Sequence, residues 1–361
     1  MRALWGICLA LILLPGMIEF APFLRITPLH GEESRNWEPL KNGSIWIKDR
    51  PQEALSELMD TNFPLRAPLI RFRNQLDYWL FGETHAREVV VGKEGTLFHK
   101  ASIGNKVGPQ AMQKTILQRT EKISRFRDTL DSYHIGFRII IAPGKRTANR
   151  SQLPVNAPSF HASQKVMEAL KQAQLPVIDL PRYFARNPLP DSIPMYPKLG
   201  LHWAPYASAL ALRQTMGSIP GLDTSLKIEI ADPEQSASAG DQELDLWNML
   251  NLIFPFETWP VHRAEVRVKG APLPKRLLVI GDSFFVEWMD EGWIFKCFEE
   301  VELLFYGRFI YEGDVSKGSI YTEDLNLMEY LRGFDEVWMM AHEDNLPAFP
   351  FGFEQHIARL N

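Results

Sequence analysis

The chain has 361 residues, of which 45% are hydrophobic and 23% charged, and its formal net charge is −5. These proportions are those of a folded globular protein and exclude an intrinsically disordered chain. The acidic balance, with no dense cluster of lysine and arginine, argues against a nucleic-acid-binding protein. The length suffices for one large α/β domain or two smaller ones. Cys8 lies inside the apolar N-terminal segment and Cys297 stands alone in the rest of the chain, so we expect no intramolecular disulfide.

The N-terminal segment, residues 1–24, differs from the rest of the chain in composition. Residues 3–18 carry no charged side chain, and the apolar character resumes after Glu19. Such a segment is either a cleaved signal peptide or an uncleaved signal anchor. No small-x-small cleavage site is evident between Pro15 and Leu24, which favours the anchor. We therefore expect the chain after about residue 30 to lie outside the cytoplasmic membrane.

Residues 25–85 are predicted to form a polar and helical lead-in. Helical patterns occur at 52–59 and 63–81, the second with three arginines among its apolar residues. A run of three valines, a turn with two glycines and a second apolar run then predict a β-hairpin over residues 89–98. A long amphipathic helix is predicted over residues 110–133, because this stretch contains neither proline nor glycine.

From residue 137 onward, strand and helix patterns alternate. This alternation predicts a mostly parallel sheet flanked by helices on both faces, in an α/β domain over residues 86–361. An acidic stretch rich in serine, alanine and glycine, residues 231–245, is interpreted as an inserted loop. In parallel sheets, sites form at the carboxyl ends of the strands. The predicted strands are 137–142, 177–178, 277–280, 301–305 and 336–340, and the predicted helices are 159–174, 203–216, 283–289 and 322–331.

The most informative motif is Gly281-Asp282-Ser283, which directly follows the apolar run 277–280. A glycine after a buried strand permits a tight turn, and a serine at the start of the next segment is placed where backbone N–H groups can hold an oxyanion. The motif favours Ser283 as a nucleophile, with Gly281 and Asp282 as candidates beside the oxyanion. The alternative is that Asp282 and Ser283 only cap the following helix.

A serine nucleophile needs a base, which is usually a histidine held by a third group. His202 is the first candidate, because it directly precedes a predicted helix and the positive end of the helix dipole favours the neutral imidazole. The alternatives are that His202 caps the helix or packs beside Trp203, or that His342, which follows a predicted strand, is the base. The histidines show no metal-binding spacing, and no cofactor site is predicted.

Five segments follow one another in a specific order along the chain: 60–66, 89–98, 141–145, 202–203 and 281–284. In this order they resemble the alginate O-acetyltransferase AlgJ/AlgX family. The family's usual pattern over the second segment is V-x-G-K-D/E-G-W-L-F, and Thr96 stands here where the tryptophan is commoner. The resemblance covers most of the chain and implies an SGNH-hydrolase-like α/β domain.

The resemblance implies Ser283 as nucleophile and His202 as base, in the order opposite to that of ordinary SGNH esterases. One residue departs from the family pattern, because the aspartate expected two residues before the histidine is Gly200. Loss of the orienting carboxylate can lower a rate by about 10⁴. Three outcomes are open: a Ser–His dyad, a carboxylate from elsewhere with Asp179 and Asp191 as candidates, or a domain with little activity.

The implied function is transfer of an acetyl group, through an acetyl-serine on Ser283, to a hydroxyl of an exported polysaccharide. The implied acetyl donor partner is a polytopic membrane-bound O-acyltransferase (MBOAT), and the N-terminal segment is the expected contact with the membrane. The implied location is the periplasm, where the chain is anchored to the bacterial inner membrane or released if the segment is cleaved. Lys145 and Arg146 are candidates for contact with an anionic polymer or else a solvated strand end, and Trp203 for contact with substrate. Two alternatives stay open: a catalytically weak or inactive scaffold that binds polysaccharide in an exopolysaccharide acetylation complex, and a carbohydrate acetylesterase.

Overall fold

The structure is a computed structural model. It describes residues 27–31, 38–63, 65–104, 109–157, 162–219, 226–236, 240, 243–254, 261–313, 315–319 and 326–357. The signal segment predicted over residues 1–24 lies outside these ranges. None of the helices in the described part of the chain is both long and apolar enough to cross a membrane. The chain divides into two compact units, Met1–Val91 with Leu246–Glu257, and Gly92–Asp245 with Thr258–Asn361.

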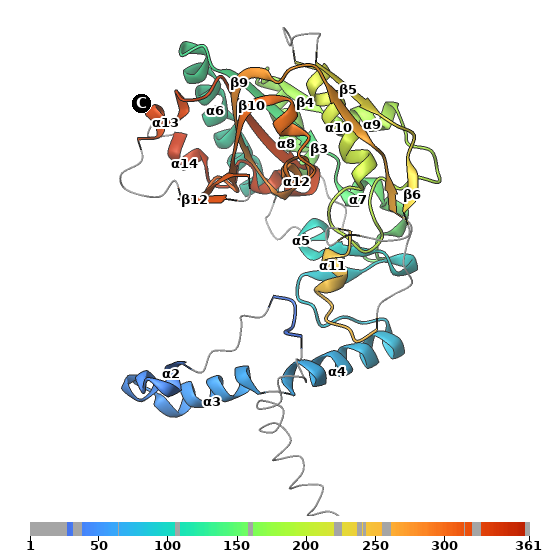
Figure 1. The fold of residues 1–361 in the computed structure, drawn as a ribbon, viewed down its shortest axis with the longest axis vertical. Coiled ribbons are helices and arrows are strands. Elements are labelled where there is room, and N and C mark those ends of the chain that lie inside the picture. Colours follow the sequence, from blue (N-terminus) through green and yellow to red (C-terminus); the bar gives the residue numbers. More distant parts are fainter. Residues whose placement is uncertain are drawn as a thin grey trace, which may run out of the picture. The chain divides into compact units, whose positions relative to one another are not determined.

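The first unit is helical, and its two longest described helices are α3 (Pro51–Asn62) and α4 (Arg66–Phe81), drawn in blue in Figure 1. Both coincide with the helical patterns of the lead-in. The segment 246–254 packs on α4, where the side-chain oxygen of Gln75 accepts the backbone N–H of Ile253 at 3.1 Å. The other elements of this unit are α2 (Glu38–Lys41), the 3₁₀ turn η1 (Ser44–Ile47) and β1 (Val89–Val91).

The second unit is built on a sheet that has seven strands within the described residues. In spatial order they are β12 (Val315–Ser319), β11 (Phe309–Glu312), β10 (Phe298–Phe305), β9 (Leu273–Gly281), β13 (Glu336–His342), β3 (Gly136–Ala142) and β4 (Val177–Asp179). The five strands from β10 to β4 pair in parallel, whereas β11 and β12 add an antiparallel edge. The predicted mostly parallel sheet is therefore confirmed, and its two antiparallel edge strands are not among the predicted ones.

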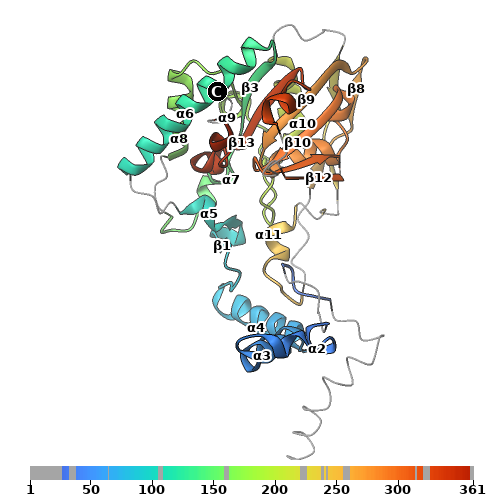
Figure 2. The same ribbon diagram turned by 90° about the vertical axis from the view of Figure 1, so that its left-hand side faces the viewer.

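Helices cover both faces of this sheet, as predicted. β13 is buried along its whole length, and its side chains alternate between two cores. Trp338 faces a core formed with α10 (Pro205–Gly217), whereas Met339 faces one formed with α6 (Pro109–Ser132) and α8 (Ala162–Gln172), which lie side by side (Figure 2). The remaining helices are α5 (Lys100–Ile103), α7 (Lys145–Ala148), α9 (Leu180–Arg186), α12 (Val286–Asp290), α13 (Leu327–Leu331) and α14 (Glu354–Ile357).

The acidic stretch 231–245 is more than an inserted loop. It contains β6 (Glu234–Ser236), which pairs antiparallel with β7 (Val261–Arg263), and it ends at the first residue of α11 (Asp245–Asn248). Two further short strands flank this region in the sequence, β5 (Lys227–Ile230) and β8 (Val266–Lys269), and they pair antiparallel with each other. Elsewhere in the chain, β2 (Leu97–His99) follows the predicted hairpin turn. The interpretation of this stretch as a loop is therefore corrected.

The carboxyl ends of three neighbouring strands meet at one edge of the sheet. The strand register pairs Ala142, at the end of β3, with His342, at the end of β13. β9, on the other side of β13, ends at Gly281. The segments that follow these strands are therefore neighbours, and Ser283 lies two residues beyond β9.

Candidate active site

Ser283 lies in a tight turn at the end of β9. Gly281 ends the strand, and a Cβ atom built on it would lie 3.2 Å from a backbone oxygen of β13, so glycine suits the close spacing of the strands. Asp282 then caps a short 3₁₀ turn that begins at Ser283, because its side chain accepts the N–H of Phe284. The cap and the serine at the strand end therefore occur together, although the sequence presents them as alternatives.

A serine, a histidine and an aspartate form a hydrogen-bonded chain at this edge. The Nε2 atom of His202 lies 2.8 Å from Oγ of Ser283, and the Nδ1 atom lies 2.8 Å from Oδ2 of Asp245. The other oxygen of Asp245 accepts the backbone N–H of Leu201 at 2.7 Å, which fixes the carboxylate against the histidine loop. The arrangement is that of a serine–histidine–carboxylate triad.

The carboxylate partner of the histidine is Asp245, so the two aspartates suggested by the sequence do not take this place. Asp179 contacts Nζ of Lys171 at 2.6 Å and caps α9 by accepting the N–H of Arg182 at 3.0 Å. Asp191 is exposed on the surface. A Ser–His dyad does not describe the arrangement either, because both ring nitrogens of the histidine have partners.

Sequence reasoning missed Asp245 because 43 residues separate it from His202 and because it ends an acidic stretch that reads as a loop. One signal could have found it. Leu246 and Trp247 follow directly, and both are buried. An aspartate that precedes a buried apolar pair is placed close to the protein interior, where a carboxylate needs a partner.

Lys145 holds the loop that precedes the histidine. Its buried ammonium donates hydrogen bonds to the backbone oxygens of Pro197 at 2.8 Å, of Lys198 at 3.2 Å and of Gly200. Burial lowers the pKa of Lys145 to about 7, although the charge of Asp245 acts in the opposite direction. The side chain is 1% exposed, so the expected contact of Lys145 with an anionic polymer is wrong.

Arg146 is buried as well. Its guanidinium donates to the backbone oxygens of Ile103 at 2.8 Å and Ser102 at 3.3 Å, and its backbone N–H donates to Asp344 at 3.3 Å. A cation whose donors are used inside the protein is not presented to a polymer, nor is it part of a solvated strand end. Both interpretations of Arg146 are therefore corrected.

Asp282 belongs to an internal charge pair. Its carboxylate accepts the backbone N–H of His342 at 3.0 Å, the ring Nδ1–H at 2.7 Å and the Asn345 amide at 3.3 Å. Burial would raise the pKa of Asp282, but the charge and hydrogen bonds of His342 lower it. Burial would lower the pKa of His342, but the charge and hydrogen bond of Asp282 raise it. Asp282 therefore holds the turn instead of facing an oxyanion, and His342, the alternative base, has its Nδ1 atom bound to Asp282.

Trp203 belongs to the core. It is 1% exposed, and its indole stacks on Trp288 with 5.8 Å between ring centroids, so the expected contact with substrate is wrong. The phenyl ring of Phe284 packs on Trp203 at 5.4 Å, on His202 at 5.3 Å and on His342 at 4.3 Å. One ring that directly follows the candidate nucleophile thus contacts both histidines.

Two further residues surround Ser283. Tyr306 follows β10 with a positive φ of 49°, and its N–H donates to the oxygen of Gly281 at 2.8 Å. Burial raises the pKa of the Tyr306 phenol, and interactions with Ser283 and Asn345 lower it, so the phenol lies near both residues. The backbone N–H of Ser283 and the side-chain amide of Asn345 are therefore candidate oxyanion donors. Both residues follow carboxyl ends of strands, a signal that was available in the sequence.

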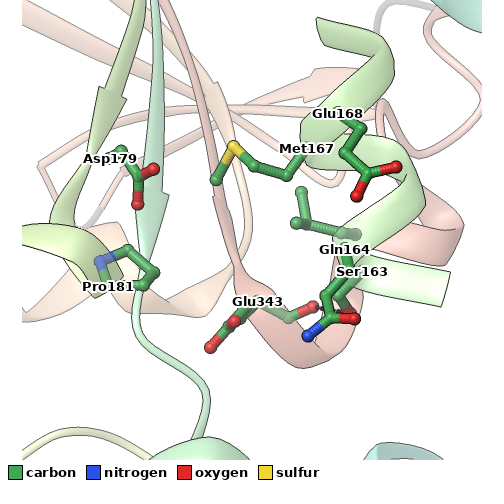
Figure 3. A pocket seen from close by; sticks show the side chains of 8 residues that line it. Ser163, Gln164, Met167, Glu168, Asp179, Pro181 and Glu343 are labelled. Carbon is green, nitrogen blue, oxygen red and sulfur yellow. Dashed lines mark hydrogen bonds between the residues drawn. The ribbon is translucent and has the colours of Figure 1, made fainter. Parts of the chain in front are cut away.

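A pocket near the end of β4 does not include the serine, the histidine or the aspartate of this chain of hydrogen bonds (Figure 3). In Figure 3, Asp179 and Pro181 lie across it from Met167 and Gln164. Glu343 also lines the pocket, and burial raises the pKa of its carboxyl group. The candidate active site is therefore located by its geometry and not by this pocket. Among the described residues, no group of histidine, cysteine, aspartate and glutamate side chains is arranged to hold a metal ion.

The chain is similar to known proteins in sequence and in fold. A family model described as the SGNH hydrolase-like domain of the acetyltransferase AlgX matches residues 89–268. Bacillus cereus PatB1 is similar in structure, with a TM-score of 0.51 and 14% identity over 73% of this chain and 99% of its own. The O-acetyltransferase domain of Pseudomonas putida AlgJ gives a TM-score of 0.49 and 14% identity over 74% and 99%. Pseudomonas aeruginosa AlgX gives a TM-score of 0.43 and 13% identity, over 74% of this chain and 67% of its own. None of the curated proteins matches the chain.

At such low identity the likeness to PatB1 concerns the fold alone. The domain match adds sequence information, since it spans the loop with His202 and the stretch with Asp245. Ser283 lies beyond the matched residues, at the end of a strand of the same sheet. The resemblance inferred from the motifs is confirmed, and the chain belongs to the AlgJ/AlgX-like family of SGNH hydrolase-like proteins.

Proposed function

We propose that the chain is an O-acetyltransferase that acetylates an exported polysaccharide through an acetyl-serine on Ser283. The observation that carries the proposal is the unbroken chain of hydrogen bonds from Ser283 through His202 to Asp245. Such a chain supplies a nucleophile, a base and an orienting carboxylate, which are the parts that acyl transfer needs. The match to an acetyltransferase domain supports acetyl as the group transferred.

In the first half of the reaction, Ser283 attacks the acetyl donor. The Nε2 atom of His202 takes the proton as Oγ forms a bond to the carbonyl carbon, and a tetrahedral intermediate results. When this intermediate collapses, the bond to the leaving group breaks and His202 gives its proton to that group. Asp245 accepts the Nδ1–H throughout and stabilises the transient imidazolium.

In the second half, a hydroxyl of the polysaccharide takes the place of the leaving group. His202 removes the hydroxyl proton while the sugar oxygen attacks the acetyl carbon. The ester bond to Ser283 then breaks, and Oγ recovers a proton from His202. Transfer rather than hydrolysis requires that the acceptor reaches the acetyl-enzyme before water does.

The negative charge of each tetrahedral intermediate falls on the former carbonyl oxygen. The candidate donors are the backbone N–H of Ser283 and the side-chain amide of Asn345, because both groups lie near the Tyr306 phenol. We expect the acyl oxygen to lie beside them when an acetyl donor binds. Donors that are already aimed at the developing charge need no reorganisation during the reaction.

The proposal includes a setting outside the cytoplasmic membrane. The uncharged run 3–18 supports retention at the membrane, and an MBOAT-type partner would deliver the acetyl group there. The alternative of an inactive scaffold depended on Gly200, which replaces the family's aspartate. The absence of an aspartate at position 200 no longer argues for an inactive scaffold, because Asp245 supplies a carboxylate to His202.

The test is to mix the purified full chain with an activated acetyl ester, with and without an oligosaccharide acceptor. We expect intact-protein mass spectrometry to show one acetyl group on Ser283, and the acceptor to discharge it. Ser283→Ala should show none, whereas Ser132→Ala, which removes an exposed serine at the end of α6, should behave as the wild type. Absence of acetyl-Ser283 would contradict catalysis by this chain. Release of acetate at a rate independent of the acceptor would identify an esterase instead.

A further inference from the structure

Helix α4 of the first unit carries an apolar stripe on its outer surface. Its members recur at intervals of three and four residues, so at 100° per residue they fall within about 100° of the helix circumference. In a soluble protein such a stripe normally faces the core. Here it is open, because the five side chains are exposed: Leu69 by 57%, Phe72 by 55%, Leu76 by 37%, Trp79 by 61% and Leu80 by 68%.

The opposite, mostly polar face of α4 is the one that packs within the first unit. Gln75 is buried, and its side-chain oxygen accepts the backbone N–H groups of Ile253 and Phe254 at 3.1 and 3.0 Å. Asn74 donates to the backbone oxygen of Leu250 at 3.0 Å. The helix therefore uses its polar face for its own unit and presents the apolar face outward.

Arg71 ties α4 to the point where the apolar N-terminal segment ends. Its guanidinium donates to the backbone oxygens of Thr27 and Pro28, both at 2.7 Å. Thr27 is three residues beyond Leu24, and an extended chain covers at most about 3.6 Å per residue. Thr27, which Arg71 of α4 contacts, thus lies within roughly 11 Å of the end of a segment with the composition of a signal anchor.

We propose that α4 is an interfacial helix that lies in the surface of a lipid bilayer, with its stripe Leu69, Phe72, Leu76, Trp79 and Leu80 (the α4 stripe) inserted below the headgroups. Tryptophan is enriched at this depth, where its ring meets both acyl chains and water. The closeness to the apolar segment favours lipid as the occupant over another protein. The inference rests on the expectation that residues 3–18 enter a bilayer, but not on the chemistry proposed for Ser283.

The charges beside the stripe fit the same environment. Arg73 is exposed, and its position on the helix falls at the edge of the α4 stripe. A long cationic side chain at that edge can reach lipid phosphates while its stem covers apolar surface. Trp79 stacks on Phe254 with 5.5 Å between ring centroids, and Phe254 is itself 54% exposed, so the apolar surface extends beyond the helix. Contact of the α4 stripe with the bilayer would add a second membrane attachment to the one that the apolar segment provides.

The experiment uses the full chain in vesicles of phosphatidylethanolamine and phosphatidylglycerol, with a nitroxide spin label at one cysteine. Leu69→Cys, combined with Cys8→Ser, reports on the stripe. Leu117→Cys in the same background is the matched control, since it replaces a leucine of α6 that is 56% exposed. Native Cys8, labelled alone, reports on the apolar segment. Burial raises the pKa of Cys297 to about 12, so that thiol does not compete for the label at neutral pH.

The readout is the ratio of collisions with oxygen, which partitions into lipid, to collisions with a water-soluble nickel chelate. We expect this ratio to be several-fold higher at position 69 than at position 117. With Leu76→Asp and Leu80→Asp added, the ratio at position 69 should fall to that of the control while the Cys8 label stays in lipid. Acetylation of Ser283 by the activated ester should not change, which separates this inference from the proposed function.

Three results would overturn the inference. If position 69 is as accessible to the nickel chelate as position 117 while Cys8 is in lipid, α4 lies in water. If position 69 is shielded from both oxygen and nickel, another protein surface, from this chain or a second copy, covers the α4 stripe. If neither Cys8 nor position 69 is in lipid, the bilayer is not the partner of this unit.

Discussion

Two histidine–aspartate pairs pack against the same phenyl ring of Phe284, and they differ in burial and in their further partners. In the pair His202–Asp245, the side chains are 16% and 26% exposed, and the second ring nitrogen of the histidine meets Ser283. In the pair His342–Asp282 they are 9% and 0% exposed, and the aspartate also accepts a backbone N–H and an amide. The comparison teaches that a histidine used for proton transfer needs an accessible second nitrogen, whereas one used for structure is held in one charge state.

The first prediction concerns the more exposed pair, His202–Asp245 (the open pair), and has the largest expected effect on rate. Asp245→Asn keeps the size of the side chain but cannot hold the tautomer in which His202 accepts the serine proton, so kcat should fall by about 10⁴. The measurement is the rate of acetyl-Ser283 formation, followed by mass spectrometry. Asp191→Asn, at an exposed position, should keep the wild-type rate. A loss of less than about tenfold in Asp245→Asn would contradict the assignment of the carboxylate.

The second prediction concerns the donors around the serine. Asn345→Ala removes one of the two candidate oxyanion donors, and loss of one oxyanion donor lowers kcat by about 10²–10³ with little change in KM. Steady-state kinetics with the activated ester would measure it. Gln355→Ala, an exposed change in the same C-terminal segment, is the control. An increase in KM at unchanged kcat would place Asn345 in ground-state binding instead.

Part of this site could be predicted from the sequence. Ser283 was predictable because a glycine ends a buried strand directly before it, and His202 because it precedes a helix within a family-like order. The sheet was predictable for the same reason, since its parallel strands are continuous apolar runs. These signals are local, and they depend on residues only a few positions apart.

The rest depends on contacts between distant parts of the chain. Lys145 reads as a solvated strand end, and its burial follows from three backbone carbonyls that lie 52 to 55 residues further on. Asp245 reads as part of an acidic loop, and its role follows from His202, 43 residues earlier. No local pattern records such partners, so the carboxylate and the buried cation appear only in the folded chain.

The third prediction loosens the loop of the open pair without touching its reacting atoms. Lys145→Met removes the three hydrogen bonds to the loop before His202, and a displacement of about 1 Å in such a loop can cost up to 10²-fold in rate. Because the pKa of Lys145 is about 7, wild-type kcat should decline as the ammonium loses its proton above that pH. The variant should lack this decline. Lys165→Met, at an exposed lysine of α8, is the control.

If Lys145 only stabilised the fold, Lys145→Met would lower kcat by the same factor at every pH. This result would contradict the prediction that the charged ammonium positions the loop before His202. Urea unfolding of Lys145→Met gives an independent measurement. The folded-state pKa lies below the ordinary value of 10.5, so protonated Lys145 costs stability and the wild type should gain stability relative to the variant as pH rises from about 7 to 10.5. The opposite trend would show that the ammonium is stabilised in the folded chain.

The last prediction concerns the buried pair, His342–Asp282 (the closed pair), where the expected effect on rate is smallest. The raised pKa of His342 means that its contribution to stability is full below the ordinary value of 6.5 and is lost as pH rises through the folded-state pKa. The lowered pKa of Asp282 means that its contribution is full above 3.8 and is lost as pH falls through its folded-state value. The free energy of unfolding lost in His342→Gln should therefore be greatest between these two values.

Above pH 6.5 the difference between wild type and His342→Gln should shrink, by about 1.4 kcal/mol for each unit by which the pKa of His342 is raised. Urea unfolding at about pH 5.5 and about pH 8, below and above the ordinary imidazole pKa of 6.5, measures this difference. In the same variant, the rate of acetyl-Ser283 formation should stay within about tenfold of the wild type. A loss as large as that expected for Asp245→Asn would reverse the comparison, because it would make His342 the base and His202 the structural partner.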